Sequence, residues 1–244
     1  MQILKKIFAG WAIFVFITSL LLLFPFFLVI FQIFPKSKTT ISYPVRVFWA
    51  RLLLFCFGIR IKLHADNYSF EKGNYIFVSN HRSLLDIVIC NAVIPLKFQF
   101  LAKKELTKIP LFGYIIRNTS LMVNRESNTS KVNSLTLLKE TLKKGTSVLV
   151  FPEGTRNTTE VYLQPLRNGA FRLAEETGTP IVVITIWNTS ELFTRNFHFS
   201  PGTIHIFVSD PIFPIKGEKL AEMKENAIQI FTTNIEKAVL LKGH

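Results

Sequence analysis

A long run of apolar residues opens the sequence and separates it from an ordinary soluble chain. Residues 7–34 contain no charged side chain and no histidine, and lysines stand on both sides of the run. As a helix rising about 1.5 Å per residue, this run exceeds the roughly 30 Å hydrocarbon core of a bilayer. It can therefore tilt, or it can break into two shorter helices that enter and leave one leaflet, and Pro25 favours the break.

The alternative for this segment is a cleaved signal peptide. The apolar run is too long for the hydrophobic region of a signal peptide, and no small-residue cleavage site follows it. We therefore expect the segment to be retained and to attach the protein to a membrane. The lysines do not settle its orientation, because they lie on both sides of the run.

A second apolar stretch, residues 47–59, is interrupted by Arg51. It predicts an amphipathic helix that lies on the membrane or caps the folded domain. Residues 1–60 are thus expected to form membrane-anchoring helices. Residues 61–244 are expected to form one domain of ordinary size.

The pattern changes beyond residue 60 to short β-rich runs separated by helical stretches. The predicted strands cover residues 59–65, 75–79, 98–102, 120–124, 147–151, 181–186 and 203–209. The predicted helices cover residues 83–93, 132–145, 168–178 and 218–241. Alternating strands and helices predict an α/β fold, in which a mixed β-sheet is flanked by helices.

Charge and composition narrow the class of partner. The formal net charge of +13 suits nucleic acid, an anionic membrane surface or an anionic substrate. The basic residues are scattered and form no nucleic-acid-binding signature, so no nucleic acid is expected. A mean hydropathy of +0.32 and 24 phenylalanines point towards lipid instead. Cys56 and Cys90 lie in apolar surroundings without disulfide or zinc spacing, which predicts buried thiols in a reducing compartment.

The first candidate for chemistry follows the strand predicted at residues 75–79. His81 lies at the end of this strand, and Asp86 lies five residues further on. Two residues five apart are about 140° out of phase on an ideal helix, so the pair can meet only if His81 lies in the turn before the helix. Asp86 would then accept a hydrogen bond from one imidazole nitrogen and leave the other as a general base.

Asp86 also has a purely structural alternative. Ser83 and Asp86 fit the capping-box pattern, in which the acid satisfies backbone N–H groups at the start of a helix. A metal site is disfavoured, because the remaining histidines show no ligand spacing. These are His64, His198, His205 and His244. No G-x-S-x-G turn is present, so catalysis here would proceed without an enzyme nucleophile.

The second candidate lies at residues 148–156, where a predicted strand ends in the sequence Phe-Pro-Glu-Gly-Thr-Arg. Gly154 allows the backbone to approach an oxyanion closely, and Arg156 can bind a phosphate through two parallel hydrogen bonds. A turn of this composition is commonly structural, so the motif alone does not decide between the two roles.

Cations also end two other predicted strands. Lys103 and Lys104 follow the strand at residues 98–102, and Arg125 follows the strand at residues 120–124. A single cation at a strand end is usually solvated. Three such strand ends beside a histidine turn predict an anion pocket, because reactive residues of α/β sheets gather where strands end.

These motifs together resemble the glycerolipid acyltransferase family, in particular the 1-acylglycerol-3-phosphate acyltransferases. The resemblance rests on Asn80-His81-x4-Asp86, on Arg125, on the FPEGTR block at residues 151–156, and on the apolar strand after Pro180. Their order and spacing match the family from about residue 75 to 185, and the hydrophobic N-terminus fits it as well. Neither block would be decisive alone, but the pair is specific.

The resemblance implies a role for each of these residues. His81 would be the general base and Asp86 would hold its tautomer, while Arg125 and Lys103 would bind the acceptor's phosphate. The other residues assigned to the acceptor site are Glu153, Gly154, Thr155 and Arg156. No cofactor and no metal are expected, because a thioester has a good leaving group and a positioned base is sufficient chemistry.

Three departures from the family pattern affect specificity. The family often shows Phe-Lys-Lys-Gly-Ala where this chain has Leu-Arg-Asn-Gly-Ala at residues 166–170, so one cation is missing. The strand at residues 181–184 lacks a second proline, and the acid common before the strand-end arginine is Asn124 here. These differences leave the catalytic pair intact and leave the acceptor head group and chain length open.

The leading hypothesis is an acyltransferase that moves a fatty acyl group from acyl-CoA or acyl carrier protein to the sn-2 hydroxyl of 1-acylglycerol 3-phosphate. The product would be phosphatidic acid, and the enzyme would be membrane-bound with its catalytic domain on the cytoplasmic face. One alternative keeps the chemistry but uses another lysophospholipid or a lyso-aminolipid. An alternative of another class is a non-catalytic membrane lipid-binding protein, and a metal-dependent phosphohydrolase is a more distant one.

Overall fold

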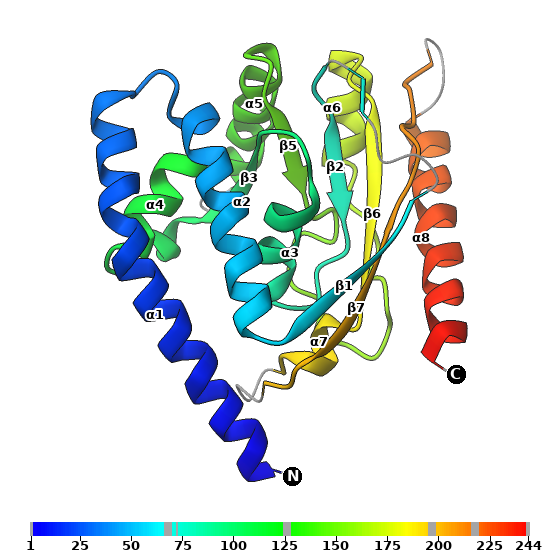
Figure 1. Ribbon diagram of the computed structural model, residues 1–244. Coiled ribbons are helices and arrows are strands. Elements are labelled where there is room, and N and C mark those ends of the chain that lie inside the picture. Colours follow the sequence, from blue (N-terminus) through cyan, green and yellow to red (C-terminus); the bar gives the residue numbers. More distant parts are fainter. Residues whose placement is uncertain are drawn as a thin grey trace.

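The computed structural model describes residues 2–65, 70–71, 73–123, 128–194, 199–215 and 220–242. Over these ranges the chain forms a seven-stranded sheet with helices on both faces (Figure 1), in the strand order β1-β7-β6-β2-β5-β3-β4. Neighbouring strands are parallel except for β6 and β7, which are antiparallel. The predicted mixed sheet flanked by helices is therefore confirmed.

The strands lie where the hydrophobic pattern predicts them. They are β1 (Ile59–His64), β2 (Ile76–Ser79), β3 (Phe98–Lys103), β4 (Leu121–Val123), β5 (Ser147–Val150), β6 (Ile181–Trp187) and β7 (Gly202–Val208). The central strands β2 and β6 are buried along their whole length. Strands of a parallel sheet covered on both faces read as continuous apolar runs, which is the pattern of these segments.

The helices include the four that were predicted in the domain and three further short elements. They are α1 (Gln2–Ile33), α2 (Lys38–Cys56), α3 (Leu85–Val93), η1 (Lys104–Lys108), α4 (Phe112–Thr119), α5 (Asn128–Lys143), α6 (Gly169–Thr177), α7 (Thr189–Leu192) and α8 (Leu220–Lys242). The 3₁₀ helix η1 and the helices α4 and α7 were not predicted. Each has at most eight residues, too few for a clear helical period.

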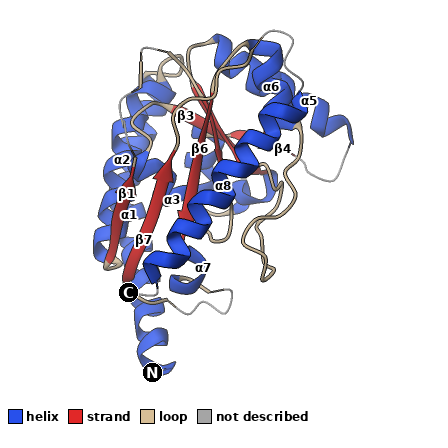
Figure 2. Cartoon of the chain, turned by 90° about the vertical axis from the view of Figure 1, so that its right-hand side faces the viewer, coloured by secondary structure: helices blue, strands red, loops and turns tan. Residues whose placement is uncertain are grey.

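Two hydrophobic cores lie on opposite faces of the sheet. Side chains of successive strand residues alternate between them, as the pleat requires. Phe77 and Val182 face the core made with α1, α2, α3 and α4. Ile76 and Val183 face the core made with α5, α6 and α8. Figure 2 shows α8 lying across the second of these faces.

Helix α1 continues through Pro25, so the predicted break at this residue is wrong. A proline inside a helix removes one backbone hydrogen bond, but the neighbouring turns of α1 are held by packing. Phe27 and Phe31 are buried, and their rings lie 6.1 Å from Trp49 and 5.8 Å from Tyr114, respectively. Tertiary contacts therefore outweigh the local effect of the proline.

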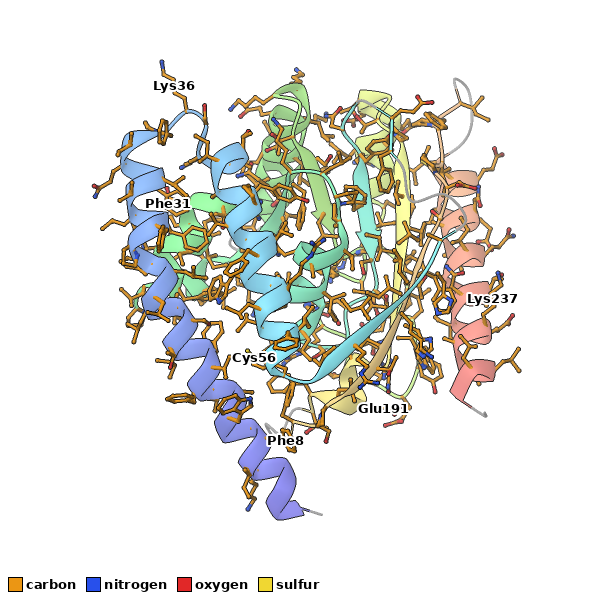
Figure 3. All side chains as sticks on the ribbon, viewed as in Figure 1. Phe8, Phe31, Lys36, Cys56, Glu191 and Lys237 are labelled. Carbon is orange, nitrogen blue, oxygen red and sulfur yellow. The ribbon has the colours of Figure 1, made fainter. Side chains whose placement is uncertain are left out.

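The chain reverses at Pro35 instead. The helical conformation is disfavoured for a residue that precedes a proline, and α1 ends just before Phe34 and Pro35. A turn that contains Lys36 leads into α2, at the end of α1 away from Phe8 (Figure 3). Helix α2 starts nine residues before the predicted amphipathic stretch, and Ile59 already belongs to β1.

Helix α1 presents much of the exposed apolar surface of the described chain. Lys6–Ile33 is long and apolar enough to cross a membrane, by length and composition. Its exposed side carries large side chains, among them Ile7, Phe14, Leu22 and Phe26, each at least half exposed. The first turns of α1 project beyond the rest of the domain (Figure 1). Helix α2 packs against α3 and thereby caps the domain.

Candidate active site

The two sequence motifs meet because the strands that carry them are neighbours. Strands β2 and β5 are parallel and adjacent, so their carboxyl ends lie at the same edge of the sheet. Residues 80–84 follow β2 and residues 151–157 follow β5. The backbone N–H of Asn157 donates to the carbonyl of His81 over 2.6 Å, which joins the two loops.

His81 and Asp86 form the predicted pair. His81 lies in the loop before α3, and Asp86 lies in the first turn of that helix. The His81 Nδ1 and the Asp86 Oδ2 are 2.9 Å apart. The His81 side chain is 16% exposed, and within the described part of the chain its Nε2 has no hydrogen-bond partner. This nitrogen is therefore available to take a proton from a substrate.

Asp86 also makes the backbone hydrogen bonds that the capping-box alternative predicts, in addition to its bond to the imidazole. The backbone N–H groups of Arg82 and Ser83 each donate to the same Oδ2 over 2.7 Å. The bond from Ser83 is one half of a capping box, and the Ser83 hydroxyl accepts from the N–H of Leu85. The start of the helix thus fixes the carboxylate, and the carboxylate fixes the imidazole.

Phe151 holds the imidazole from its face. The rings of His81 and Phe151 are nearly parallel, with centroids 4.2 Å apart and planes 25° apart. Phe151 directly follows β5, so a residue of the second motif packs against the imidazole of the first. Phe151 covers one face of the ring and Asp86 binds Nδ1, so Nε2 is the ring nitrogen left without a hydrogen bond in the described part of the chain.

Glu153 connects the loop after β2 with the segment after β5 through hydrogen bonds to their backbone. It is buried, its Oε1 accepts from the N–H of His81 over 2.7 Å, and its Oε2 accepts from the N–H of Gln164 over 2.9 Å. Burial raises the pKa of Glu153 above its usual value of 4.5, while the two backbone donors oppose the shift. Glu153 therefore fixes the backbone of the two loops relative to each other.

Asn80 has a structural role that the sequence did not reveal. Its Nδ2 donates to the carbonyl of Ile186 and its Oδ1 accepts from the N–H of Ile186, both over 2.8 Å. This two-point bond joins the end of β2 to the end of β6. The asparagine that precedes the histidine thus fixes the position from which the catalytic loop leaves the sheet.

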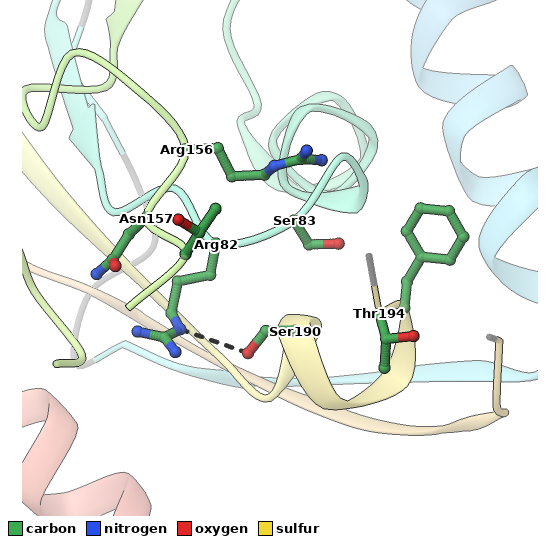
Figure 4. A pocket seen from close by; sticks show the side chains of 8 residues that line it. Arg82, Ser83, Arg156, Asn157, Ser190 and Thr194 are labelled. Atoms are coloured by element: carbon green, nitrogen blue, oxygen red, sulfur yellow. Dashed lines mark hydrogen bonds between the residues drawn. The ribbon is translucent and has the colours of Figure 1, made fainter. Parts of the chain in front are cut away.

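A polar cavity of about 210 Å³ adjoins this pair. It is lined by Arg82, Ser83, Arg156, Asn157, Thr158, Ser190, Phe193 and Thr194 (Figure 4). His81 is not a lining residue, but the cavity begins at the two residues that follow it. The contributions from Ser190, Phe193 and Thr194 were not predicted, since they come from the short helix α7 and the segment after it.

The two arginines of this cavity differ in their availability. The Arg82 guanidinium donates to the carbonyls of Val161 and Thr159 over 2.6 and 3.1 Å, and to the Ser190 hydroxyl over 3.4 Å. Its hydrogen-bonding capacity is therefore largely used within the protein. Arg156 makes no hydrogen bond or ion pair within the described ranges, so its guanidinium is available for an anion in the cavity.

The other described residues predicted for the acceptor site do not line this cavity. Gly154 has a φ of +80°, a conformation that favours glycine, and a Cβ there would also meet the flexible Arg167 side chain, 2.4 Å from its Nε. Thr155 is exposed. Lys103 is exposed at the end of β3, two strands away from β2, and does not line the cavity. Arg125 lies outside the described residues.

Comparison with known proteins agrees with this architecture. A family model described as "Acyltransferase" matches residues 60–187, just over half of the chain. The chain therefore belongs to the acyltransferase family. The crystal structure of the 1-acyl-sn-glycerophosphate (LPA) acyltransferase PlsC from Thermotoga maritima has the same fold, with a TM-score of 0.81 at 22% identity over 97% of both chains.

Several curated proteins are similar in sequence. The 1-acyl-sn-glycerol-3-phosphate acyltransferase of Borreliella burgdorferi is 31% identical over 193 residues, which cover 77% of this chain and 74% of that protein. The chloroplastic enzyme BAT2 of Brassica napus, also named 1-acyl-sn-glycerol-3-phosphate acyltransferase, is 27% identical over 80% of this chain. The enzyme of that name from Saccharomyces cerevisiae is 30% identical over 69%. The matched region spans 57% of the Brassica and yeast proteins.

Replacing Asp86 by alanine should destabilise the protein markedly. The change leaves the buried N–H of Ser83, the N–H of Arg82 and the imidazole without their acceptor, so the free energy of unfolding should fall by about 2–3 kcal/mol. Denaturant unfolding in detergent would measure this loss. The exposed Asp210→Ala is the matched control and should change stability by less than about 0.5 kcal/mol. Equal stabilities of the two variants would contradict the bonding described for Asp86.

Glu153→Gln should lower stability in a pH-dependent way. Glutamine keeps one acceptor oxygen and turns an amide towards the other N–H, which should cost about 1–3 kcal/mol at neutral pH. Because the pKa of Glu153 is raised in the folded state, its stabilising contribution is largest below the ordinary value of 4.5 and falls as pH rises through the raised value. The stability difference between wild type and variant should therefore widen as pH falls from 7 to 4. A difference that narrows over this range would show that the sign is wrong.

Proposed function

We propose that this protein transfers a fatty acyl group from a thioester donor to the sn-2 hydroxyl of 1-acylglycerol 3-phosphate, giving phosphatidic acid for phospholipid synthesis. The observation that carries the proposal is the His81–Asp86 pair. Its Nε2 has no hydrogen-bond partner in the described part of the chain, and the next two residues, Arg82 and Ser83, line the same cavity as Arg156. The names of the related proteins point to the same acceptor. The donor is acyl-CoA or acyl carrier protein.

In the proposed reaction His81 acts as general base. Its Nε2 takes the proton of the acceptor hydroxyl as the oxygen attacks the thioester carbonyl carbon. The tetrahedral intermediate collapses with cleavage of the C–S bond, and the imidazolium returns the proton to the leaving thiolate. Asp86 stabilises the imidazolium and holds the ring in place. This sequence needs no metal and no cofactor beyond the donor.

Arg156 is the proposed contact for the acceptor's phosphate. A guanidinium can donate two parallel hydrogen bonds to phosphate oxygens, and the polar walls of the cavity suit such a group. Lys103 and Arg125 remain predicted phosphate contacts on the strength of the family resemblance. Asn168 stands where the family often has a lysine. We expect this difference to affect the preference for the acceptor head group and not the acyl-transfer step.

Helix α1 is proposed to hold the enzyme on the membrane. The acceptor and the product are lipids, so a catalytic domain fixed at the bilayer surface meets its substrate there. The exposed apolar side of α1 is suited to burial in hydrocarbon. The net charge of +13 favours an anionic surface, and the free thiols Cys56 and Cys90 agree with a catalytic domain on the cytoplasmic face.

His81→Ala should reduce acyl transfer by at least about 1,000-fold, because it removes the general base. Asp86→Asn should reduce it by about 100-fold or more while remaining folded, since one carbonyl oxygen can keep the hydrogen bonds of Oδ2 without its charge. The assay is transfer of a radiolabelled acyl group from acyl-CoA, and then from acyl carrier protein, to 1-acylglycerol 3-phosphate in detergent. His64→Ala, on β1, is the histidine control and should remain active.

The same assay offers glycerol 3-phosphate, lysophosphatidylcholine and a lyso-aminolipid as alternative acceptors. Turnover with one of these alone would keep the mechanism and replace the acceptor. Turnover with none of them, from either donor, would favour a non-catalytic lipid-binding protein. An active His81→Ala protein would refute the assignment of the base.

Arg156→Met should raise the KM for 1-acylglycerol 3-phosphate by at least about tenfold and change the hydrolysis of the donor thioester little, because it removes a phosphate contact and not the base. Steady-state kinetics with varied acceptor would show this. The matched control is Arg172→Met, an exposed arginine on α6, which packs on the opposite face of the sheet. A larger effect on thioester hydrolysis than on acceptor use would argue against the phosphate-binding role.

A further inference from the structure

Arg46 is a buried cation that the proposed reaction does not use. It lies on α2, only 6% exposed, and within the described ranges it has no acidic partner. Its guanidinium donates to the Oδ1 of Asn91 over 3.3 Å and to the carbonyl of Phe98 over 3.1 Å. It also lies near the rings of Tyr43 and Phe98, 5.8 and 5.4 Å from their centroids.

These contacts are part of a larger set of bonds from α2 to the carboxyl end of α3. The Tyr43 hydroxyl donates to the carbonyl of Ile94, the residue that follows α3. The Nε of Arg51 donates to the carbonyl of Ala92 over 3.3 Å. With the Arg46–Asn91 bond, three side chains of α2 hold the last turn of α3. The cations also lie where the helix dipole is negative, which is favourable.

Burying an arginine between two helices without a counter-ion costs free energy, because the charge loses its hydration. Burial lowers the pKa of Arg46 to about 10, so the side chain remains charged at neutral pH. Its Nε and the hydroxyl of Ser42, one turn earlier on α2, are both buried without a hydrogen-bond partner among the described residues. An apolar side chain of similar volume would often pack as well or better. This cost suggests that the directional hydrogen bonds of Arg46, which fix α3 relative to α2, have a function.

The contact of Arg46 with α3 lies between helix α1 and the His81–Asp86 pair. Trp49, almost one turn after Arg46 on α2, donates from Nε1 to the Ser19 hydroxyl of α1 over 2.9 Å, and its ring stacks on Phe16 with centroids 5.7 Å apart. On the other side, α3 has only nine residues, and its first turn carries Asp86. A displacement of the carboxyl end of so short a helix displaces its start as well.

We propose that Arg46 is a positioning residue, which holds the carboxyl end of α3 against α2 and thereby fixes the His81–Asp86 pair relative to the helix that meets the lipid. The proposal rests on the proposed acyl transfer. It assigns a catalytic consequence to a residue that lies outside both sequence motifs and outside the cavity. Its effect is on the chemical step, since a base displaced by about 1 Å can lose up to about two orders of magnitude in rate.

The test compares three variants in vesicles that contain 1-acylglycerol 3-phosphate, well below the unfolding temperature of each. Arg46→Met keeps the aliphatic stem and loses both hydrogen bonds and the charge, so kcat should fall about tenfold while the KM for the acceptor changes by less than about twofold. Arg46→Lys keeps the charge but cannot donate to Asn91 and Phe98 together, so it should recover part of the lost kcat. Lys97→Met is the matched control, because Lys97 bonds Thr40 of α2 over 3.3 Å at an exposed position and should leave kcat unchanged.

Hydrogen exchange provides a second readout that does not depend on turnover. Peptides covering residues 82–90 should exchange faster in Arg46→Met than in wild type or Lys97→Met, because the start of α3 is no longer fixed. A folded Arg46→Met protein with wild-type kcat, or with unchanged exchange at α3, would overturn the proposal. Absence of turnover in the wild type would refute the proposed function instead, and the exchange comparison would still decide whether Arg46 fixes α3.

Discussion

A single carboxylate oxygen organises the catalytic end of this protein. The Oδ2 of Asp86 accepts from the imidazole of His81 and from the backbone N–H groups of Arg82 and Ser83. The acid is only 1% exposed, so its charge depends on these donors for the stabilisation that water would otherwise supply. The orientation of the His81 imidazole is therefore set at the start of α3. A movement of this helix also moves the imidazole.

The rest of the site supports that arrangement through backbone bonds. Asn80 fastens the loop after β2 to β6, and Glu153 fastens it to the segment after β5. Both side chains are buried and act on main-chain groups. The motif residues thus fall into two kinds, those that build the loops and those that face the cavity. Among the described motif residues, His81 and Arg156 each keep a nitrogen group without a hydrogen bond inside the protein.

The sequence predicted the parts of this structure that depend on local pattern. The strands were visible as apolar runs, and the spacing of His81 and Asp86 implied a turn followed by a helix. Features that depend on distant contacts could not be predicted. Pro25 favoured a break in α1 by its local effect. The packing of Phe27 and Phe31 against Trp49 and Tyr114, which keeps the helix continuous, cannot be inferred from neighbouring residues. Arg82 directly follows His81, and its guanidinium binds the carbonyls of Thr159 and Val161, a contact that the local pattern does not reveal. Arg46 stands directly before the apolar stretch at residues 47–59, and a charged side chain there gave no sign of burial.

The strand order has a consequence for the synthesis of the protein. Strand β1, which directly follows the two N-terminal helices, pairs with β7, so that Ile59 lies beside Gly202. β2 likewise pairs with β6 as well as with β5. Contacts between such distant segments form slowly, and the sheet cannot be completed until most of the chain has left the ribosome. Helix α1 emerges long before then, so its apolar side needs cover from the bilayer or from a chaperone while the domain behind it is still unfolded.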